Sequence, residues 1–182
     1  MKTTTMLQNA FLVAQESKCV SYRVGAIIAK DDRPISSGYN GTVSDQPNCD
    51  EVALDNGWAE YVDVPGVGKE LRLREDKSDD YSAWAKSNVI HAEMNAILFA
   101  ARGGKSIEGA TMYCTMAPCP DCAKMIAQSR IRTLVYCEEY NGARQDWSKT
   151  LTDCGVKVIK IDKKFLTMIN WQTVLSKRKR IE

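Results

Sequence analysis

Two short runs of the sequence carry residue types that bind metals and move protons. The first holds His91 and Glu93, and the second holds Cys119 and Cys122 behind a proline. His91 is the only histidine in the chain. One imidazole and two thiolates are zinc ligands, and a set of three leaves the fourth position open, as in catalytic rather than structural zinc sites. Glu93 is then predicted to lie beside the metal-bound water, where its carboxylate would accept and donate protons.

The elements around these residues are predicted to be two helix N-termini. Apolar residues recur at helical spacing over Val89–Arg102, which indicates a helix over this range with His91 and Glu93 in its first turn. Pro120 suits the first turn of a second helix, where Cys119 and Cys122 stand three positions apart. The positive ends of two helix dipoles would favour thiolates and a metal hydroxide at one point.

Two other interpretations of the same residues stay open. His91 could be a core histidine and the cysteine pair a redox C-x-x-C. Alternatively, the site could be a structural zinc in a non-enzymatic module, with Cys114 or Cys137 as the fourth ligand. The combined pattern favours the catalytic site over both.

Composition indicates one globular domain without a nucleic-acid footprint. The 182 residues suit a single domain with a sizeable core, and the formal charge of +2 is close to balanced. Seven cysteines without a recognisable signal peptide predict a reducing, cytoplasmic location. No apolar run reaches the roughly 18 residues of a membrane span. We therefore expect neither a membrane nor a nucleic acid as a partner.

The order of elements predicts an α/β fold. A first helix is expected over 3–17, a hairpin of strands over 24–29 and 35–39, and strands over 110–115, 133–137 and 156–161. Helices are expected between the last three strands, and a final one over 163–175, so these strands should be parallel. The result is a mixed five-stranded sheet with helices on both faces.

Two segments fall outside this pattern. Residues 42–88 are polar, with only a short helix expected over 49–58, and we interpret them as an insertion within the single domain 1–182. Residues 176–182 are a basic tail, which we expect to be solvated.

With these residues in view, the chain resembles the deoxycytidylate deaminases, particularly the bacteriophage type. The resemblance rests on residues 24–26, 38–41, 91–97 and 117–122, and the histidine, glutamate and cysteine pattern is that of the zinc-dependent nucleobase deaminases. It implies the three-layer α/β/α cytidine deaminase-like fold and zinc-dependent hydrolysis of dCMP to dUMP and ammonia, which feeds dTMP synthesis. It also implies a homo-hexamer in the host-cell cytoplasm, activated by dCTP and inhibited by dTTP, with Mg²⁺ on these effectors.

The resemblance also implies roles for substrate-binding residues. The backbone N–H of Ala92 would donate to the base carbonyl, and the backbone carbonyl of Ala117 would accept from the amino group. Asn40 would bind the sugar. Tyr140 would close over the base. For the phosphate, Arg23 is a candidate because a guanidinium matches phosphate geometry, although an exposed arginine at a strand end is an equally good interpretation.

Regulation is expected at one turn of the chain. In the resembling family the turn that matches Gly38, Tyr39, Asn40 and Gly41 lies between the substrate and triphosphate sites, so these residues are the allosteric candidates. A plain hairpin terminus is the alternative.

A second metal site is a weaker expectation. Cys19 and Cys49 match cysteines that bind a structural zinc in phage relatives, together with a histidine that this chain lacks. We therefore expect one zinc per chain.

A rival function is deamination of transfer RNA or single-stranded DNA. It would need a basic groove with aromatic platforms, whereas here the basic residues are scattered.

Overall fold

A five-stranded mixed sheet forms the centre of the computed structural model, which describes residues 2–139 and 146–166. Its strands are β1 (Gly25–Lys30), β2 (Arg33–Tyr39), β7 (Thr111–Met116), β8 (Thr133–Glu138) and β9 (Lys157–Lys160), in the order β2-β1-β7-β8-β9. Strand β1 is antiparallel to both β2 and β7, whereas β7, β8 and β9 are parallel. The predicted mixed sheet is confirmed.

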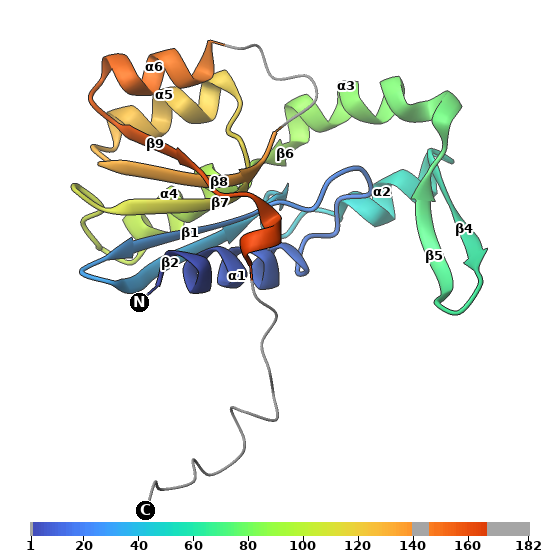
Figure 1. Cartoon of the computed structure of the whole chain (residues 1–182). Coiled ribbons are helices and arrows are strands. Elements are labelled where there is room, and N and C mark those ends of the chain that lie inside the picture. The colour runs from blue at the N-terminus through green and yellow to red at the C-terminus, as the bar shows by residue number, and fades with distance from the viewer. Residues whose placement is uncertain (1, 140–145, 167–182) are drawn as a thin grey trace, which may run out of the picture.

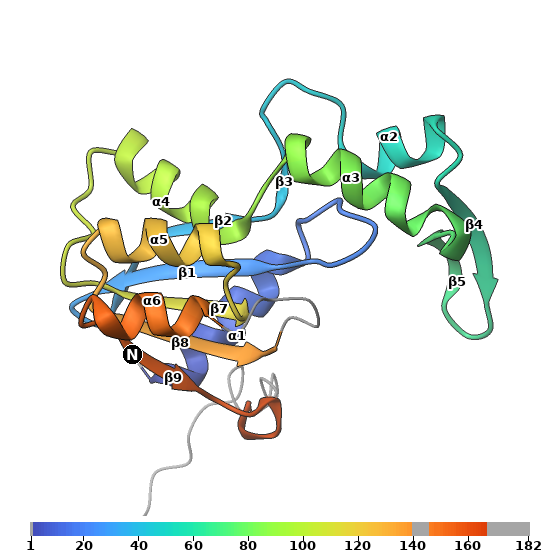
Figure 2. The same cartoon turned by 90° about the horizontal axis from the view of Figure 1, so that it is seen from above.

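Helices cover both faces of this sheet. On one face lie α4 (Ala92–Arg102), α5 (Pro120–Gln128) and α6 (Trp147–Asp153), and on the other lies α1 (Thr3–Ala14), as Figure 2 shows. Neighbouring residues on the central strands point alternately into the two interfaces. Ile28 and Leu134 pack with the α4 and α5 side, while Ile27 and Val135 pack with α1. The fold is therefore the expected three-layer α/β/α arrangement.

Residues 42–88 form more structure than the sequence indicated. They hold α2 (Cys49–Asp55), a hairpin of β4 (Ala59–Val64) and β5 (Gly68–Leu73), a short 3₁₀ turn η1 (Glu75–Lys77), and α3 (Ser78–Asn88). Figures 1 and 2 show these elements projecting from one side of the sheet. A small core of their own holds them, in which the rings of Trp58, Tyr81 and Trp84 lie 5.7–6.3 Å apart.

Several element boundaries differ from the predictions. The helix expected from Val89 begins at Ala92, because Val89–Ile90 form β6 and pair with β3 (Gly41–Thr42). The first helix ends at Ala14 instead of residue 17. Gly38 and Gly41 do not close the hairpin: they belong to β2 and β3.

The C-terminal predictions are only partly covered by the described residues. Lys163–Phe165 form a 3₁₀ turn, η2, where a helix over 163–175 was expected. The remainder of that helix and the basic tail 176–182 lie outside the described residues. No helix in 2–139 or 146–166 is long and apolar enough to cross a membrane.

Candidate active site

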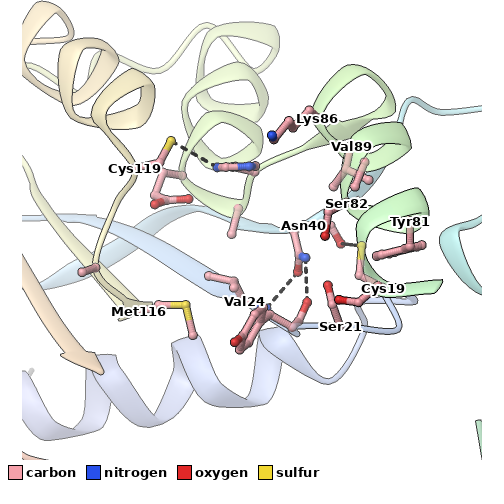
Figure 3. Close-up of a pocket in the computed structure, with 17 residues that line it drawn as sticks. Cys19, Ser21, Val24, Asn40, Tyr81, Ser82, Lys86, Val89, Met116 and Cys119 are labelled. Carbon is pink, nitrogen blue, oxygen red and sulfur yellow. Dashed lines mark hydrogen bonds between the residues drawn. The ribbon is translucent and has the colours of Figure 1, made fainter. Parts of the chain in front are cut away.

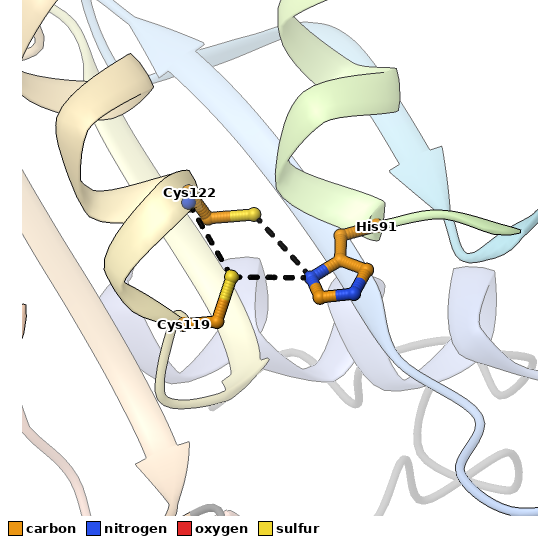
Figure 4. Close-up of side chains that lie close together, drawn as sticks. All are labelled: His91, Cys119 and Cys122. Atoms are coloured by element: carbon orange, nitrogen blue, oxygen red, sulfur yellow. Dashed lines mark hydrogen bonds between the residues drawn. The ribbon is translucent and has the colours of Figure 1, made fainter. Parts of the chain in front are cut away.

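The three predicted metal ligands meet at the N-termini of two helices. His91 is the N-cap of α4, and Cys119 is the N-cap of α5, whose second residue after Pro120 is Cys122. The His91 Nδ1 atom lies 3.4 Å from the Cys119 sulfur and 3.5 Å from the Cys122 sulfur (Figure 4). The ligand atoms of all three residues lie within 4.8 Å of one another, and no other group of three such side chains occurs in the described part of the chain.

These distances fit a zinc ion. Tetrahedral zinc with a nitrogen and a sulfur ligand separates the two ligand atoms by about 3.5 Å, given bonds of about 2.0 and 2.3 Å. The observed separations of 3.4 and 3.5 Å match this edge. The donor set also fits, since a neutral imidazole and two thiolates satisfy three corners of the tetrahedron. His91, Cys119 and Cys122 are therefore the residues that would hold the metal.

The two cysteines are electrostatically prepared to lose protons to a metal. The Cys119 sulfur accepts a hydrogen bond from the Cys122 backbone N–H at 3.4 Å, at the positive end of α5. Hydrogen bonding from the Cys122 side chain, together with His91, lowers the pKa of Cys119 to about 4. The pKa of Cys122 is raised because it keeps the proton that the pair shares, and burial adds to this shift. The hydrogen bond to Cys119 raises the pKa of His91.

Glu93 lies beside this cluster in the first turn of α4. Its side chain is buried, with 3% of the residue exposed. Burial raises the pKa of its carboxyl from 4.5 to about 7. A carboxyl with a pKa near neutrality can both accept and donate a proton at physiological pH, which is the property required of a proton carrier.

A pocket opens in front of the cluster. Its volume is about 240 Å³, slightly below the range for small-ligand sites, which begins at about 300 Å³. His91, Glu93 and Cys119 line it, together with Ala92 and Ala117, the two residues expected to contact the base. The structure thus brings these five sequence-predicted site residues, together with Asn40, to one cavity.

One wall of the pocket comes from the insertion and was missed by sequence reasoning. Ser78, Ser82 and Lys86 line the pocket at spacings of four residues along one face of α3. Figure 3 shows Ser82 and Lys86 across the pocket from Met116 and Cys119. Among the described residues that line the pocket, Lys86 is the only lysine or arginine. The sequence held one signal for this wall: residues that immediately precede His91 in the chain must lie close to it in space.

Asn40 also lines the pocket and is held in a fixed orientation. Its side-chain oxygen accepts from the Val24 backbone N–H at 2.8 Å, and its Nδ2 donates to the Tyr22 carbonyl at 2.8 Å (Figure 3). Its backbone carbonyl accepts from the Ser17 hydroxyl at 2.8 Å. A carboxamide has two donor hydrogens and two acceptor lone pairs, so one of each is left for a ligand.

The residues around Asn40 pack tightly against α4. A Cβ at Gly38 would lie 2.4 Å from the Ala92 carbonyl oxygen and 2.4 Å from the Ala96 nitrogen. Asn95 Nδ2 donates to the Tyr39 carbonyl at 2.7 Å. The end of β2 is therefore joined to the helix that carries His91 and Glu93. Gly41 differs, because a Cβ there would meet nothing within 4 Å.

Two predicted substrate residues are not placed in the pocket by the described part of the chain. Arg23 is exposed and is not among the residues that line the pocket in the described part of the chain. Tyr140 lies outside the described residues.

The cysteines of the weaker metal prediction do come together. The sulfurs of Cys19 and Cys49 lie 2.7 Å apart in the interior, and no third histidine, cysteine or carboxylate joins them within the described residues.

Comparison with known proteins identifies the family. Residues 1–138 match the model described as the cytidine and deoxycytidylate deaminase zinc-binding region. The chain is 46% identical to the deoxycytidylate deaminase of Enterobacteria phage T4, over 96% of this chain and 97% of that protein. It is 37% identical to the deoxycytidylate deaminase of Mycobacterium phage D29, over 71% and 89% of the two chains.

A solved structure is similar in fold as well as in sequence. The dCMP deaminase of cyanophage S-TIM5, crystallised with dCMP and dUMP, aligns with a TM-score of 0.64 at 31% identity, over 88% of this chain and 99% of that one. The chain therefore belongs to the cytidine and deoxycytidylate deaminase family of zinc-dependent hydrolases, in its bacteriophage deoxycytidylate deaminase branch.

Proposed function

We propose that this chain hydrolyses dCMP to dUMP and ammonia with one catalytic zinc ion. The observation that carries the proposal is the convergence of His91, Cys119 and Cys122 beside the buried carboxyl of Glu93, in a pocket of small-ligand size. The phage relatives named deoxycytidylate deaminase, and the cyanophage enzyme crystallised with dCMP and dUMP, support this substrate.

Zinc bound by the three ligands would supply an activated water at neutral pH. The protein's own part is carried by Glu93, which takes a proton from the attacking water and delivers it to ring N3, making C4 electrophilic. After the water oxygen bonds to C4, the same carboxyl takes the second proton from that oxygen and gives it to the amino group. The C4–N bond then breaks, the C4 carbonyl forms, and ammonia leaves. The buried position of Glu93 and its pKa of about 7 suit both transfers.

Backbone groups and Asn40 orient the nucleoside. The N–H of Ala92 would donate to the base carbonyl, and the carbonyl of Ala117 would accept from the amino group; both residues line the pocket. Asn40 would bind the sugar with its remaining donor and acceptor, because Val24 and Tyr22 already fix its orientation. Tyr140 is proposed, on the family resemblance alone, to close over the base.

Lys86 is proposed to bind the phosphate, with Ser82 as a hydroxyl donor. Both line the pocket, and Lys86 forms no ion pair among the described residues, so its ammonium is available to an anion. Hydrogen bonds to a charged group stabilise a complex more than neutral ones do. Arg23, the alternative from the sequence, is exposed and outside the pocket lining of the described chain.

The test is a deamination assay over cytosine, deoxycytidine, dCMP and dCTP, with ammonia release as the readout. We expect the highest kcat/KM for dCMP, and loss of activity on zinc removal with recovery on zinc addition. Release of ammonia only from a transfer RNA or a single-stranded DNA would contradict the proposal and support the rival substrate class.

Regulation by dCTP and dTTP is proposed on the family resemblance, at residues Gly38–Gly41. The contacts that support coupling are the packing of Gly38 against α4 and the hydrogen bond from Asn95 to Tyr39, since α4 carries Glu93. Tyr39 is 43% exposed and thus accessible to an effector. Linkage requires that an activator and a substrate strengthen each other's binding by the same factor.

Regulation is tested by the Kd of each triphosphate, with Mg²⁺, in the presence and absence of an unreactive dCMP analogue. The analogue should lower the Kd of dCTP and raise that of dTTP. Unchanged constants for both would refute regulation. The homo-hexamer remains a prediction, which the molar mass from sedimentation equilibrium tests. The cytoplasmic location also remains a prediction.

A further inference from the structure

We infer that Cys19 and Cys49 form a reversible disulfide that joins the segment after α1 to the insertion helix α2. The two sulfurs lie 2.7 Å apart, although the residues are 30 positions apart in the chain. Cys19 is 3% exposed and Cys49 is 1% exposed, so both thiols are held in the interior with their sulfurs facing each other.

The surroundings of the pair do not fit a zinc ion. Structural zinc takes four ligands from cysteine, histidine and carboxylate side chains. Within the described residues, no histidine, carboxylate or further cysteine completes a set of three with Cys19 and Cys49. The polar side chains beside the pair are hydroxyls: that of Tyr81 accepts from the Val20 backbone N–H at 3.4 Å, and that of Ser17 accepts from the Cys19 backbone N–H at 3.2 Å. Two thiols without a third ligand are arranged for bonding to each other.

The pair is within reach of a small oxidant. Cys19 lines the pocket in front of Glu93, and Figure 3 shows it beside Tyr81 at the α3 side of this cavity. Hydrogen peroxide is the oxidant class that we propose, because it is small enough to enter. In a reducing compartment the pair stays a dithiol, and a disulfide there is typically transient and responsive to oxidation.

The chemistry is balanced by one peroxide for each pair. One thiol, as its thiolate, attacks a peroxide oxygen, which forms a sulfenic acid, and the O–O bond breaks to release water. The second sulfur then attacks the sulfenic sulfur; the S–S bond forms and the S–O bond breaks to release a second water. The two sulfurs lose two electrons in total, and the peroxide is reduced to two waters that take up both thiol protons.

Oxidation would change the wall of the pocket. The Cys19 thiol donates to the Asn40 carbonyl at 3.8 Å, and this weak contact disappears when the thiol proton is lost. The cross-link would also tie the insertion, which carries Lys86, to the segment that precedes β1. Since a cross-link of this loop length stabilises the folded chain, Tm should rise by at least about 4 °C.

The experiment treats the zinc-supplied full chain with one equivalent of hydrogen peroxide, alkylates it in denaturant and maps the peptides by mass spectrometry. We expect a cross-linked peptide pair holding Cys19 and Cys49, its loss with dithiothreitol, and the rise in Tm. Cys49→Ser should lack both the cross-link and the rise, while Cys154→Ser, which removes an exposed thiol, should keep both.

Two results would overturn the inference. The first is recovery of Cys19 and Cys49 as alkylated free thiols from protein in which the exposed Cys154 has been oxidised. The second is a measured content of two zinc ions per chain that falls to one in Cys49→Ser, which would make the pair a metal site. Both outcomes are independent of whether dCMP is the substrate.

Discussion

The Cys119 sulfur lies 3.4 Å from the Nδ1 of His91, and each of these residues is the N-cap of a different helix. Helix α4 packs on β1 and β2, and α5 follows β7, so the central sheet fixes the distance between the two caps. Both helix dipoles direct their positive ends at the same point. The metal site is therefore built by the sheet topology, and its ligands need no long loop to meet.

Replacing one thiolate should remove the metal and the activity together. In Cys122→Ala only two ligands are left, which is too few to hold zinc with useful affinity. We expect less than about a tenth of the normal zinc content by elemental analysis, and a parallel loss of deamination. Cys154→Ala, which removes an exposed thiol, is the matched control and should keep both. Full zinc content in Cys122→Ala would exclude this residue as a ligand.

Glu93→Gln should separate chemistry from metal binding. The amide is close in size to the carboxyl but cannot carry the proton, so kcat should fall by at least ~10²-fold, the lower end for general acid–base catalysis. Zinc content should stay normal, because His91, Cys119 and Cys122 are unchanged. Near-normal turnover in a zinc-replete sample would show that another group moves the proton.

The sequence predicted that His91, Cys119 and Cys122 come together, because the determinants of this cluster are local. The spacing of Cys119 and Cys122 and the apolar pattern after His91 are properties of single helical turns. The sheet was also predictable, since its strands are short apolar runs such as Gly25–Lys30, bounded by turns.

Helix α3, which forms the pocket wall, was missed although it ends three residues before His91, because its helical pattern in the sequence is weak. Helix α3 has no wide apolar stripe, because its buried residue Tyr81 packs into a small aromatic cluster with Trp58, from a distant part of the chain. Similarly, the orientation of Asn40 depends on contacts with Ser17 and Val24, which only the folded chain brings together.

Lys86→Met should impair recognition of the phosphate specifically. Methionine keeps much of the length of the side chain and removes the charge, so kcat/KM for dCMP should fall about 10- to 100-fold, as expected for a hydrogen bond to a charged group. Turnover of deoxycytidine, which has no phosphate, should change little. Arg23→Met is the comparison, and a larger effect there than in Lys86→Met would return the phosphate role to Arg23.

The stability of the metal-free protein should depend on pH through Glu93. Burial raises the pKa of this carboxyl in the folded state from 4.5 to about 7. Below the lower value both states are protonated, so the group has no effect. Between the two values the unfolded chain releases the proton while the folded chain keeps it, which favours unfolding as pH rises.

Relative to Glu93→Gln, the metal-free wild type should therefore lose on the order of 3 kcal/mol of unfolding free energy between about pH 4.5 and about pH 7, and no more above that. Urea unfolding of both proteins across this range measures the difference. A gap that does not change with pH would mean that the folded and unfolded carboxyls titrate alike.

The variants Gly38→Ala and Gly41→Ala form a matched pair that tests the close packing of β2 against α4. Alanine at position 38 would place a Cβ 2.4 Å from the backbone of Ala92 and Ala96, so α4 must move away from β2. We expect Gly38→Ala to lower the free energy of unfolding by about 1–3 kcal/mol, the usual effect of overpacking. At position 41 the added methyl group meets nothing within 4 Å, so Gly41→Ala should change stability by less than about 0.5 kcal/mol. Urea unfolding of both variants measures this, and kcat should fall in Gly38→Ala because α4 carries Glu93. Equal stability of the two variants would mean that β2 and α4 are not in the close contact described above.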